Sequence, residues 1–250
     1  MTREHKGDYG YDGSFDTVSA RAQIAGVGVG SAALLAAAGV ALARGNRVAA
    51  AVAGASATQI LATAASYVYA TRSGKFRVWN QVLDDLRLHG DETLLDLGCG
   101  RGAVLLAAAK RLPQGRAIGV DLWYADQTDN SQQATLANAA AENVADRIEV
   151  RTADMTELPL ADESVDVIVS NLAIHNIPTG AGRRQALDQA IRVLRPGGRL
   201  AIADLLETRQ HAAHLRESGW RNVQRRNLGW RMWYGGPWFS TRLVTATKPA

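Results

Sequence analysis

The chain has 250 residues, of which 47% are hydrophobic, so it is long enough to bury one large core and to carry a further segment. Its formal net charge of +4 is only mildly basic, which gives little support to nucleic acid as a partner. The one cysteine, Cys99, excludes an intramolecular disulfide and is typical of a reducing compartment.

The first 72 residues differ in composition from the rest. Residues 1–21 are polar without a clear period, and we expect a mobile tail there. Residues 22–43 and 48–70 contain no charged residue, and only Arg44-Gly-Asn-Arg47 separates the two runs. A helix of 22 residues is about 33 Å long, roughly the thickness of the hydrocarbon core of a bilayer. Residues 22–72 therefore predict a helical hairpin of two transmembrane helices, and two long runs in succession argue against a signal peptide.

Basic residues flank both outer ends of this hairpin, so the positive-inside rule predicts a cytoplasmic N-terminus and a cytoplasmic domain at residues 73–250. Gly26 and Gly30 stand four residues apart, a pattern that lets helices approach closely and is compatible with a homo-oligomer formed through the hairpin. The alternative is a pair of alanine-rich helices in a soluble lid, because alanine and glycine contribute little insertion free energy. Neither run, however, shows the polar face that a soluble surface helix needs.

From residue 73 onward, strand and helix patterns alternate. We expect strands at 93–98, 116–122, 147–154, 165–172 and 199–205, and helices at 103–112, 131–144 and 183–194. Such alternation predicts an α/β fold in which a doubly wound, mostly parallel sheet carries helices on both faces. Ligands of such sheets bind beyond the carboxyl ends of the strands.

A glycine-rich loop follows the first of these strands, in the stretch Asp96-Leu-Gly98-Cys-Gly100-Arg-Gly102. Glycines allow a tight turn and let the backbone touch a ligand, and the next helix offers its N-terminal amides to a carboxylate. Asp121 ends the second strand, where it can accept hydrogen bonds from ribose hydroxyls. The same loop, read as G-x-G-x-x-A through Ala103, also fits a dinucleotide site.

Two further acids favour a ligand with an amino-acid part over a dinucleotide. Asp96 lies two residues before the first glycine, where it can bind an ammonium group and would repel a pyrophosphate. Asp154 ends the third strand, where an adenine amino group needs an acceptor. The alternative for each acid is a helix cap or a surface strand end.

These residues, with the stretches 153–176 and 192–205, make residues 76–248 resemble class I S-adenosylmethionine-dependent methyltransferases, most closely the branch that methylates quinone precursors and other small or lipidic acceptors. The resemblance implies a seven-stranded Rossmann-like sheet, with the last two strands at 222–228 and 240–248 and the final one antiparallel. It implies S-adenosylmethionine as cofactor, S-adenosylhomocysteine as product and no metal. The cofactor-binding residues that it implies are Asp96, Gly98, Cys99, Gly100, Gly102, Asp121, Leu122, Asp154, Met155, Asn171 and Leu172.

His175 follows the fourth strand and is our candidate for a general base, because its ordinary pKa suits proton removal near neutral pH. A structural histidine bonded to backbone is an equal alternative. Aromatic residues of two neighbouring segments are expected at the same mouth as substrate contacts: Trp123, Tyr124, Trp233, Tyr234 and Trp238. Such side chains stack on a flat substrate, lie in a membrane interface, or simply plug the end of the sheet.

The sequence thus predicts a membrane-anchored methyltransferase for a hydrophobic or amphipathic small molecule, such as a quinone-like, lipid or xenobiotic acceptor. Its expected partners are that acceptor and membrane lipids, with no nucleic acid. An arginine-rich stretch at 209–231 can contact anionic headgroups or be merely solvated. The alternatives are a membrane-anchored cofactor-binding module and an NAD-dependent reductase, although the Tyr-x-x-x-Lys pair of such reductases does not occur.

Overall fold

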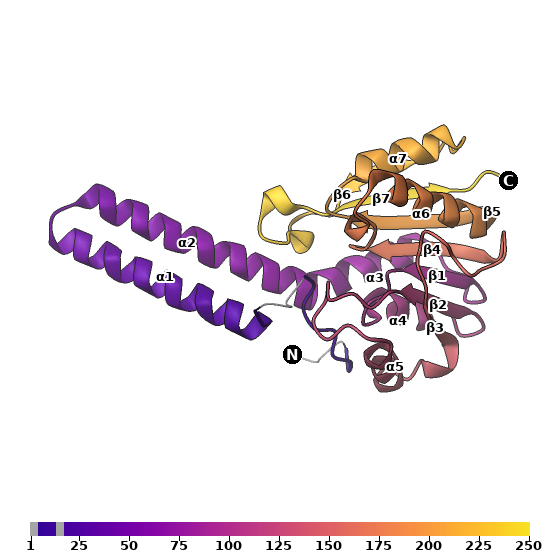
Figure 1. Cartoon of the computed structure of the whole chain (residues 1–250), viewed down its shortest axis with the longest axis horizontal. Helices are drawn as coiled ribbons and strands as arrows, with labels where there is room; N and C mark the ends of the chain where they lie inside the picture. Colours follow the sequence, from indigo (N-terminus) through magenta and orange to yellow (C-terminus); the bar gives the residue numbers. More distant parts are fainter. Residues whose placement is uncertain (1–4, 14–17) are drawn as a thin grey trace.

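The centre of the molecule is a seven-stranded sheet with strand order β3-β2-β1-β4-β5-β7-β6 (Figure 1). The structure is a computed structural model that describes residues 5–13 and 18–250. All pairs from β3 to β5 are parallel, whereas β7 runs antiparallel to both β5 and β6. The predicted doubly wound, mostly parallel α/β sheet is therefore confirmed. The strands are β1 Thr93–Leu97, β2 Arg116–Asp121, β3 Ile148–Thr152, β4 Val165–Asn171, β5 Leu194–Asp204, β6 Gln224–Asn227 and β7 Arg242–Thr247.

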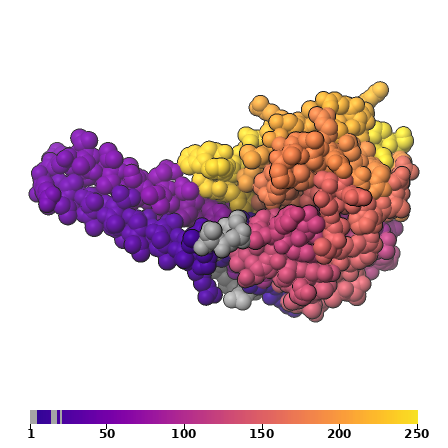
Figure 2. Space-filling model, viewed as in Figure 1, coloured from indigo at the N-terminus to yellow at the C-terminus, as the bar shows by residue number. Residues whose placement is uncertain are grey.

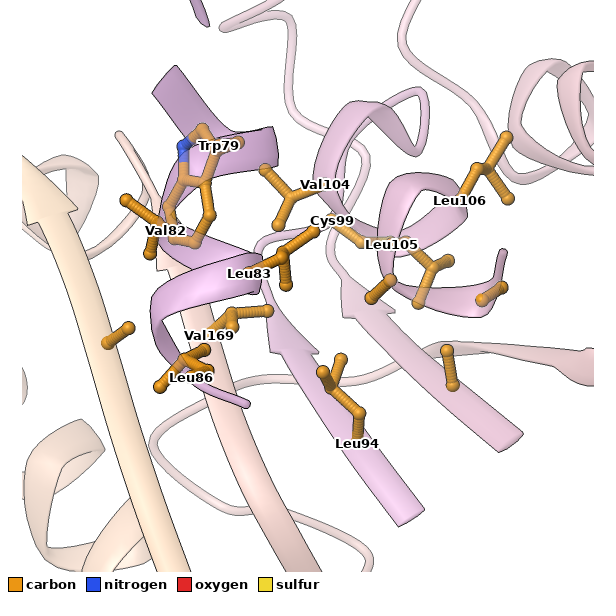
Figure 3. Close-up of a cluster of buried hydrophobic side chains, with 14 of the residues drawn as sticks. Trp79, Val82, Leu83, Leu86, Leu94, Cys99, Val104, Leu105, Leu106 and Val169 are labelled. Atoms are coloured by element: carbon orange, nitrogen blue, oxygen red, sulfur yellow. The ribbon is translucent and has the colours of Figure 1, made fainter. Parts of the chain in front are cut away.

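Helices bury both faces of this sheet. One face is covered by α3 (Lys75–Asp85), α4 (Ala103–Ala109) and α5 (Gln132–Ala141), and the other by α6 (Gly180–Val193) and α7 (Thr208–Glu217). Strand side chains alternate between the faces, so Leu94 packs in the first core and Leu95 in the second. Figure 3 shows the first core, where Trp79 and Leu83 of α3 lie over the strands. Burial on both faces explains why the central strands β1, β2 and β4 read as largely apolar runs.

The start of α5 is fixed by a local cap. The side chain of Ser131 accepts a hydrogen bond from the Ala134 amide at 3.2 Å and begins this helix. The pattern predicts neither α3 nor α7. α3 continues from the hairpin helix through residues 70–74 with no side-chain cap, so no local signal marks its start.

The first two helices form an antiparallel hairpin that stands out from the sheet domain as an arm (Figures 1 and 2). They are α1 (Ala20–Ala43) and α2 (Arg47–Tyr69), and both are long and apolar enough to cross a bilayer by length and composition alone. Only 6% and 11% of the residues in their most apolar windows are buried. At Gly26 and Gly30 an added Cβ would meet no other segment within 4 Å, so these glycines do not form the contact between α1 and α2.

The second hairpin helix continues into the sheet domain without a break. The helix passes from α2 through a π-helical turn, Ala70–Gly74, directly into α3. The segment 229–239 packs across this junction: the Ser66 hydroxyl donates to the Trp233 carbonyl at 2.8 Å, and the Tyr69 ring stacks on Trp230 with centroids 5.0 Å apart. The orientation of the hairpin is therefore tied to the end of the chain.

The N-terminal segment packs on the domain, and the expectation of a mobile tail is wrong for residues 5–13. Tyr9 is buried in the first core, and its hydroxyl donates to Glu142 of the α5 end at 3.1 Å. The backbone amides of Lys6 and Gly7 donate to the same carboxylate. One buried aromatic ring and a shared carboxylate are enough to order a polar segment. The remaining residues of the expected tail, 1–4 and 14–17, lie outside the described part of the chain.

Gly74→Ala is expected to loosen the hairpin junction. A Cβ at this position would lie 1.9 Å from the carbonyl oxygen of Arg231, so the helix or the 229–239 segment must move. Overpacking of this kind costs about 1–3 kcal/mol, which thermal unfolding of the full chain in detergent will show as a lower Tm. Gly54→Ala in α2 is the matched control, because nothing lies within 4 Å of its added Cβ. Equal Tm values for the two variants would contradict the close packing at the junction.

Candidate functional site

A cavity of about 190 Å³ lies at the carboxyl ends of β1, β2, β3 and β4. These ends flank the point where the strand order reverses, which is the usual ligand position of such a sheet. Most of the residues that the sequence predicts for the cofactor meet here: Asp96, Gly98, Cys99, Gly100, Asp121, Leu122, Asp154, Met155, Asn171 and Leu172. Gly102 is the exception, because its added Cβ would face Leu106 and Thr135 at 3.1 Å, away from the cavity. Gly102 instead precedes α4 in a left-handed conformation.

Asp96 is a buried carboxylate without a partner. Its side chain lines the cavity, it is 1% exposed, and neither of its oxygens accepts a hydrogen bond within the described chain. Burial, and then the nearby charge of Asp121, raises the pKa of Asp96 to about 8. An unpaired buried acid is costly unless a ligand supplies a donor or a positive charge. The site therefore suits a ligand that places an ammonium group against Asp96.

Asp121 is held in place by the glycine loop. The Gly100 amide donates to Asp121 Oδ2 at 2.8 Å, and the Trp123 amide donates to Oδ1 at 2.7 Å. Gly100 has a φ of +49°, and an added Cβ would lie 2.4 Å from Gln127 Oε1. Any other residue at position 100 would therefore be strained in this left-handed conformation, and its Cβ would clash with Gln127. The loop presents Asp121 with oxygen lone pairs still facing the cavity, which suits donors such as ribose hydroxyls.

The ends of β3 and β4 supply the rest of the predicted cofactor set. Asp154 Oδ1 accepts hydrogen bonds from the amide and the hydroxyl of Thr156, both at 2.8 Å, so part of this carboxylate is used within its own turn. Asn171 Oδ1 accepts a hydrogen bond from Trp79 Nε1 at 2.7 Å, which fixes the amide. Leu172 follows with a φ of +57°, a strained conformation for a branched side chain that is typical of functional loops.

His175 lies beside the cavity rather than in its lining. Its Nδ1 lies 2.5 Å from Asp204 Oδ1, and its backbone amide donates to Asp204 Oδ2 at 3.1 Å. Burial alone would lower the pKa of His175, but the Asp204 carboxylate, followed by Asp126, outweighs it and raises the pKa above 6.5. Its neighbours Ala173 and Asn176 do line the cavity. The expectation that His175 itself lines the site is not met, since its side chain pairs with a buried carboxylate.

Of the five predicted aromatic contacts, only Tyr124 lines the cavity. Trp123 turns toward β3 and donates from Nε1 to Thr152 Oγ1 at 2.7 Å. Trp233, Tyr234 and Trp238 lie outside the lining, because their segment packs on the junction of α2 and α3. These three residues therefore form no wall of the described cavity, and their contact with an acceptor stays a prediction.

Among the lining residues that were not predicted, three polar ones form one network. Asp12 Oδ1 accepts hydrogen bonds from Lys75 Nζ at 2.7 Å and from Gln127 Nε2 at 3.1 Å. Gln127 Oε1 in turn accepts from the Arg101 amide of the glycine loop at 2.8 Å. In the sequence, Lys75 is one of the basic residues that flank the hairpin and indicates only its orientation in a membrane. No sequence pattern shows that Asp12 lies beside it.

The comparisons with known proteins agree with this geometry. Residues 95–202 match the family described as a methyltransferase domain. The arsenite methyltransferase of Halobacterium salinarum is 40% identical over 118 residues, 47% of this chain and 28% of that protein. The demethylmenaquinone methyltransferase of Lactiplantibacillus plantarum is 33% identical over 150 residues, 59% of each chain.

A solved S-adenosylmethionine-dependent methyltransferase from Aquifex aeolicus shares the fold, with a TM-score of 0.53 and 21% identity over 68% of this chain and 88% of that one. The chain spans at most about three fifths of the two curated relatives. Residues 95–202 therefore match a methyltransferase domain, the sheet has the fold of an S-adenosylmethionine-dependent methyltransferase, and S-adenosylmethionine is the cofactor expected of such a domain.

Asp96→Asn is expected to stabilise the protein without cofactor while weakening cofactor binding. The folded pKa of about 8 exceeds the ordinary value of 3.8, so the fold disfavours the ionised form. Stability is therefore lost as pH rises from about 4 to about 8, and the Tm advantage of the variant should widen over that range. Thermal unfolding measured across this pH range gives the difference.

Asp129→Asn, at an exposed carboxylate outside the cavity lining, is the matched control for the unfolding series. Calorimetric titration with S-adenosylmethionine then measures whether Asp96→Asn weakens cofactor binding. Unchanged affinity in Asp96→Asn would show that this carboxylate does not receive the ammonium group.

Proposed function

We propose that this chain, in which residues 95–202 form a methyltransferase domain, transfers a methyl group from S-adenosylmethionine to a hydrophobic or amphipathic small molecule at a membrane surface. The observation that carries the proposal is Asp96, a buried, unpaired carboxylate that faces a cavity also lined by Asp121 and Asp154 from the ends of neighbouring strands. This arrangement suits a ligand with an ammonium group, a ribose and an adenine.

Three acids of the cavity have a proposed role in holding the cofactor. Asp96 would bind the ammonium group, Asp121 the ribose hydroxyls and Asp154 the adenine amine. Leu122 and Met155 would pack against the adenine, and Asn171 with Leu172 would support the methionine part. Bound there, S-adenosylmethionine supplies a methyl group on a positively charged sulfur. The chain then has to align an acceptor with that methyl and, where needed, remove a proton.

His175 is the proposed proton acceptor. Asp204 is fully buried and lies against Nδ1, so it orients the ring and leaves Nε2 as the nitrogen that can take a proton. Asp126 lines the cavity and adds to the negative field around His175. Because the carboxylates raise the pKa of His175, it accepts a proton more strongly, but a smaller fraction is neutral at pH 7.

The hairpin is the proposed membrane anchor, with the N-terminus and the sheet domain on the cytoplasmic side. Its apolar side chains are largely exposed: Val29 and Val48, for example, are 72% and 75% exposed. Exposed aromatic side chains of Trp230, Trp238 and Phe239 belong to the segment packed at the hairpin base (Figure 2). Amphipathic rings are favoured at the membrane–water interface. Such an anchor supports an acceptor that resides in the bilayer, and the demethylmenaquinone relative favours a quinone-like one.

Isotope transfer tests the proposed activity directly. Membrane lipid extracts incubated with the protein and methyl-labelled S-adenosylmethionine are expected to yield a labelled lipophilic product by mass spectrometry. Asp121→Ala should lose about 1.5–3 kcal/mol of cofactor binding and most of the labelling at limiting cofactor, because it removes charge-assisted hydrogen bonds. A wild-type protein that binds the cofactor yet labels no extract would favour a cofactor-binding module.

The pH dependence of turnover tests His175. If it accepts the proton, the rate should rise with pH through a value above 6.5, and His175→Gln should lower turnover about a hundredfold to ten-thousandfold while sparing cofactor affinity. Asp204→Asn should move the rising limb to lower pH, since it removes the carboxylate that raises the pKa. Asp188→Asn is the control, because Asp188 pairs with His214 at 2.6 Å outside the cavity lining. A limb that stays in place in Asp204→Asn would rule out this role.

Cell fractionation tests the membrane anchor. The full chain should remain in the membrane pellet after alkaline extraction. Replacement of residues 20–69 by a short Gly/Ser linker should release a protein that still binds S-adenosylmethionine, since this keeps residues 5–13 and Lys75. Removal of residues 1–72 should not, because it takes away Asp12 of the cavity lining and buried Tyr9. Recovery of the full chain in a detergent-free supernatant would contradict the anchor.

A further inference from the structure

Lys75 is a buried ammonium group that faces the cavity. It is 1% exposed and lines the site, and its one hydrogen-bond partner in the described part of the chain is Asp12 Oδ1, at 2.7 Å. An ammonium has three donors, so two remain for other acceptors. The ring of Phe76 lies near it, with 5.5 Å between Nζ and the centroid. A buried charge with unused donors in a ligand cavity is costly unless a ligand oxygen completes it.

Asp12 does not fully satisfy Lys75, because its carboxylate is shared. Besides Lys75, Oδ1 accepts from Gln127, while Oδ2 accepts from the Thr71 and Tyr234 hydroxyls, both at 2.9 Å. Four donors from three parts of the chain thus divide one negative charge. Lys75 therefore keeps an attraction for a second anionic oxygen on its cavity side.

The acids of the cavity cannot pair with one charged group of the proposed cofactor, its carboxylate. The described charged residues of the lining are five acids and one base: Asp12, Asp96, Asp121, Asp126, Asp154 and Lys75. S-adenosylmethionine carries two positive charges, on its sulfur and its ammonium, and one negative charge on its carboxylate. The acids suit the positive groups, and among the described lining residues only Lys75 offers the carboxylate a full positive charge.

The fold holds Lys75 rigidly enough for this role. Lys75 begins α3, and Trp79 lies one turn later on the same helix face, where its Nε1 binds Asn171 at the end of β4. This second contact fixes the rotation of α3 relative to the cavity. The long helix that continues from the hairpin thus places Lys75, the one basic residue of the described lining, at the cavity.

We propose that Lys75 binds the amino-acid carboxylate of the methyl donor. The inference rests on the proposed function, because it assigns one more contact to the same cofactor. It makes Lys75 a binding residue that sets the position of the methionine part opposite Asp96, so that the two charged ends of the amino acid are held by charges of opposite sign.

Paired titrations test this assignment without any acceptor. The probes are S-adenosylmethionine and decarboxylated S-adenosylmethionine, which differ only in the carboxylate, titrated calorimetrically into the full chain. The wild type should prefer the first. Lys75→Met should weaken its binding about tenfold to a hundredfold and leave the affinity for the decarboxylated probe nearly unchanged, so the preference disappears.

Thr71→Val separates this role from a structural one. Thr71 is buried and bonds to Asp12 but does not line the cavity, so its loss disturbs the same network from the other side. It should keep the preference for the carboxylate even if both affinities fall. A preference retained in Lys75→Met, or equal losses for both probes, would overturn the assignment. Failure of the wild type to bind either probe would instead contradict the proposed function.

Discussion

The carboxylate of Asp12 joins four parts of the chain that lie far apart in sequence. Its partners are Lys75 and Thr71 at the hairpin junction, Gln127 after β2 and Tyr234 in the C-terminal segment, up to 222 residues away. The Tyr67 hydroxyl also donates to its backbone carbonyl at 2.6 Å. Because Gln127 in turn bonds the glycine loop, the hairpin base and the cofactor cavity form one connected hydrogen-bond network. The position of the arm and the shape of the cavity are therefore linked.

The cavity combines this rigid support with local features that oppose stability. Asp96 is buried without a partner, and residues with left-handed backbone follow β2, β4 and β5 at Trp123, Leu172 and Glu207. Unpaired acids and strained backbones persist only where the surrounding structure determines them, and they are typical of ligand sites. Here the buried core on each face of the sheet holds these residues in place. A ligand that satisfies Asp96 would recover part of the cost.

Because α2 continues into α3, the hairpin is connected to the cavity by one uninterrupted helix. A helix has no soft joint of its own, and the π-helical turn between α2 and α3 is held by the 229–239 segment. The same helix carries Lys75 to the cavity and Trp79 to Asn171. In a membrane-anchored protein, such a helix would hold the cavity at a set distance and angle from the bilayer. This suits an acceptor that reaches the site from the membrane.

Much of the fold, and the meeting of most of the predicted cofactor residues at one cavity, follow from the sequence by itself, because their signals are local. Strands buried on both faces read as apolar runs, Asp96, Gly98 and Gly100 lie at short, fixed spacings around one strand-to-helix turn, and Asp121 ends the next strand. The packing of Tyr9 into the core, the delivery of Lys75 and the turn of Trp123 away from the cavity were decided only by the tertiary structure. Those outcomes depend on contacts between distant residues that have no period to reveal them. Likewise, nothing near residues 229–239 shows that they contact a helix residue 167 positions earlier, because that contact exists only once the sheet has brought its last strands beside the hairpin junction.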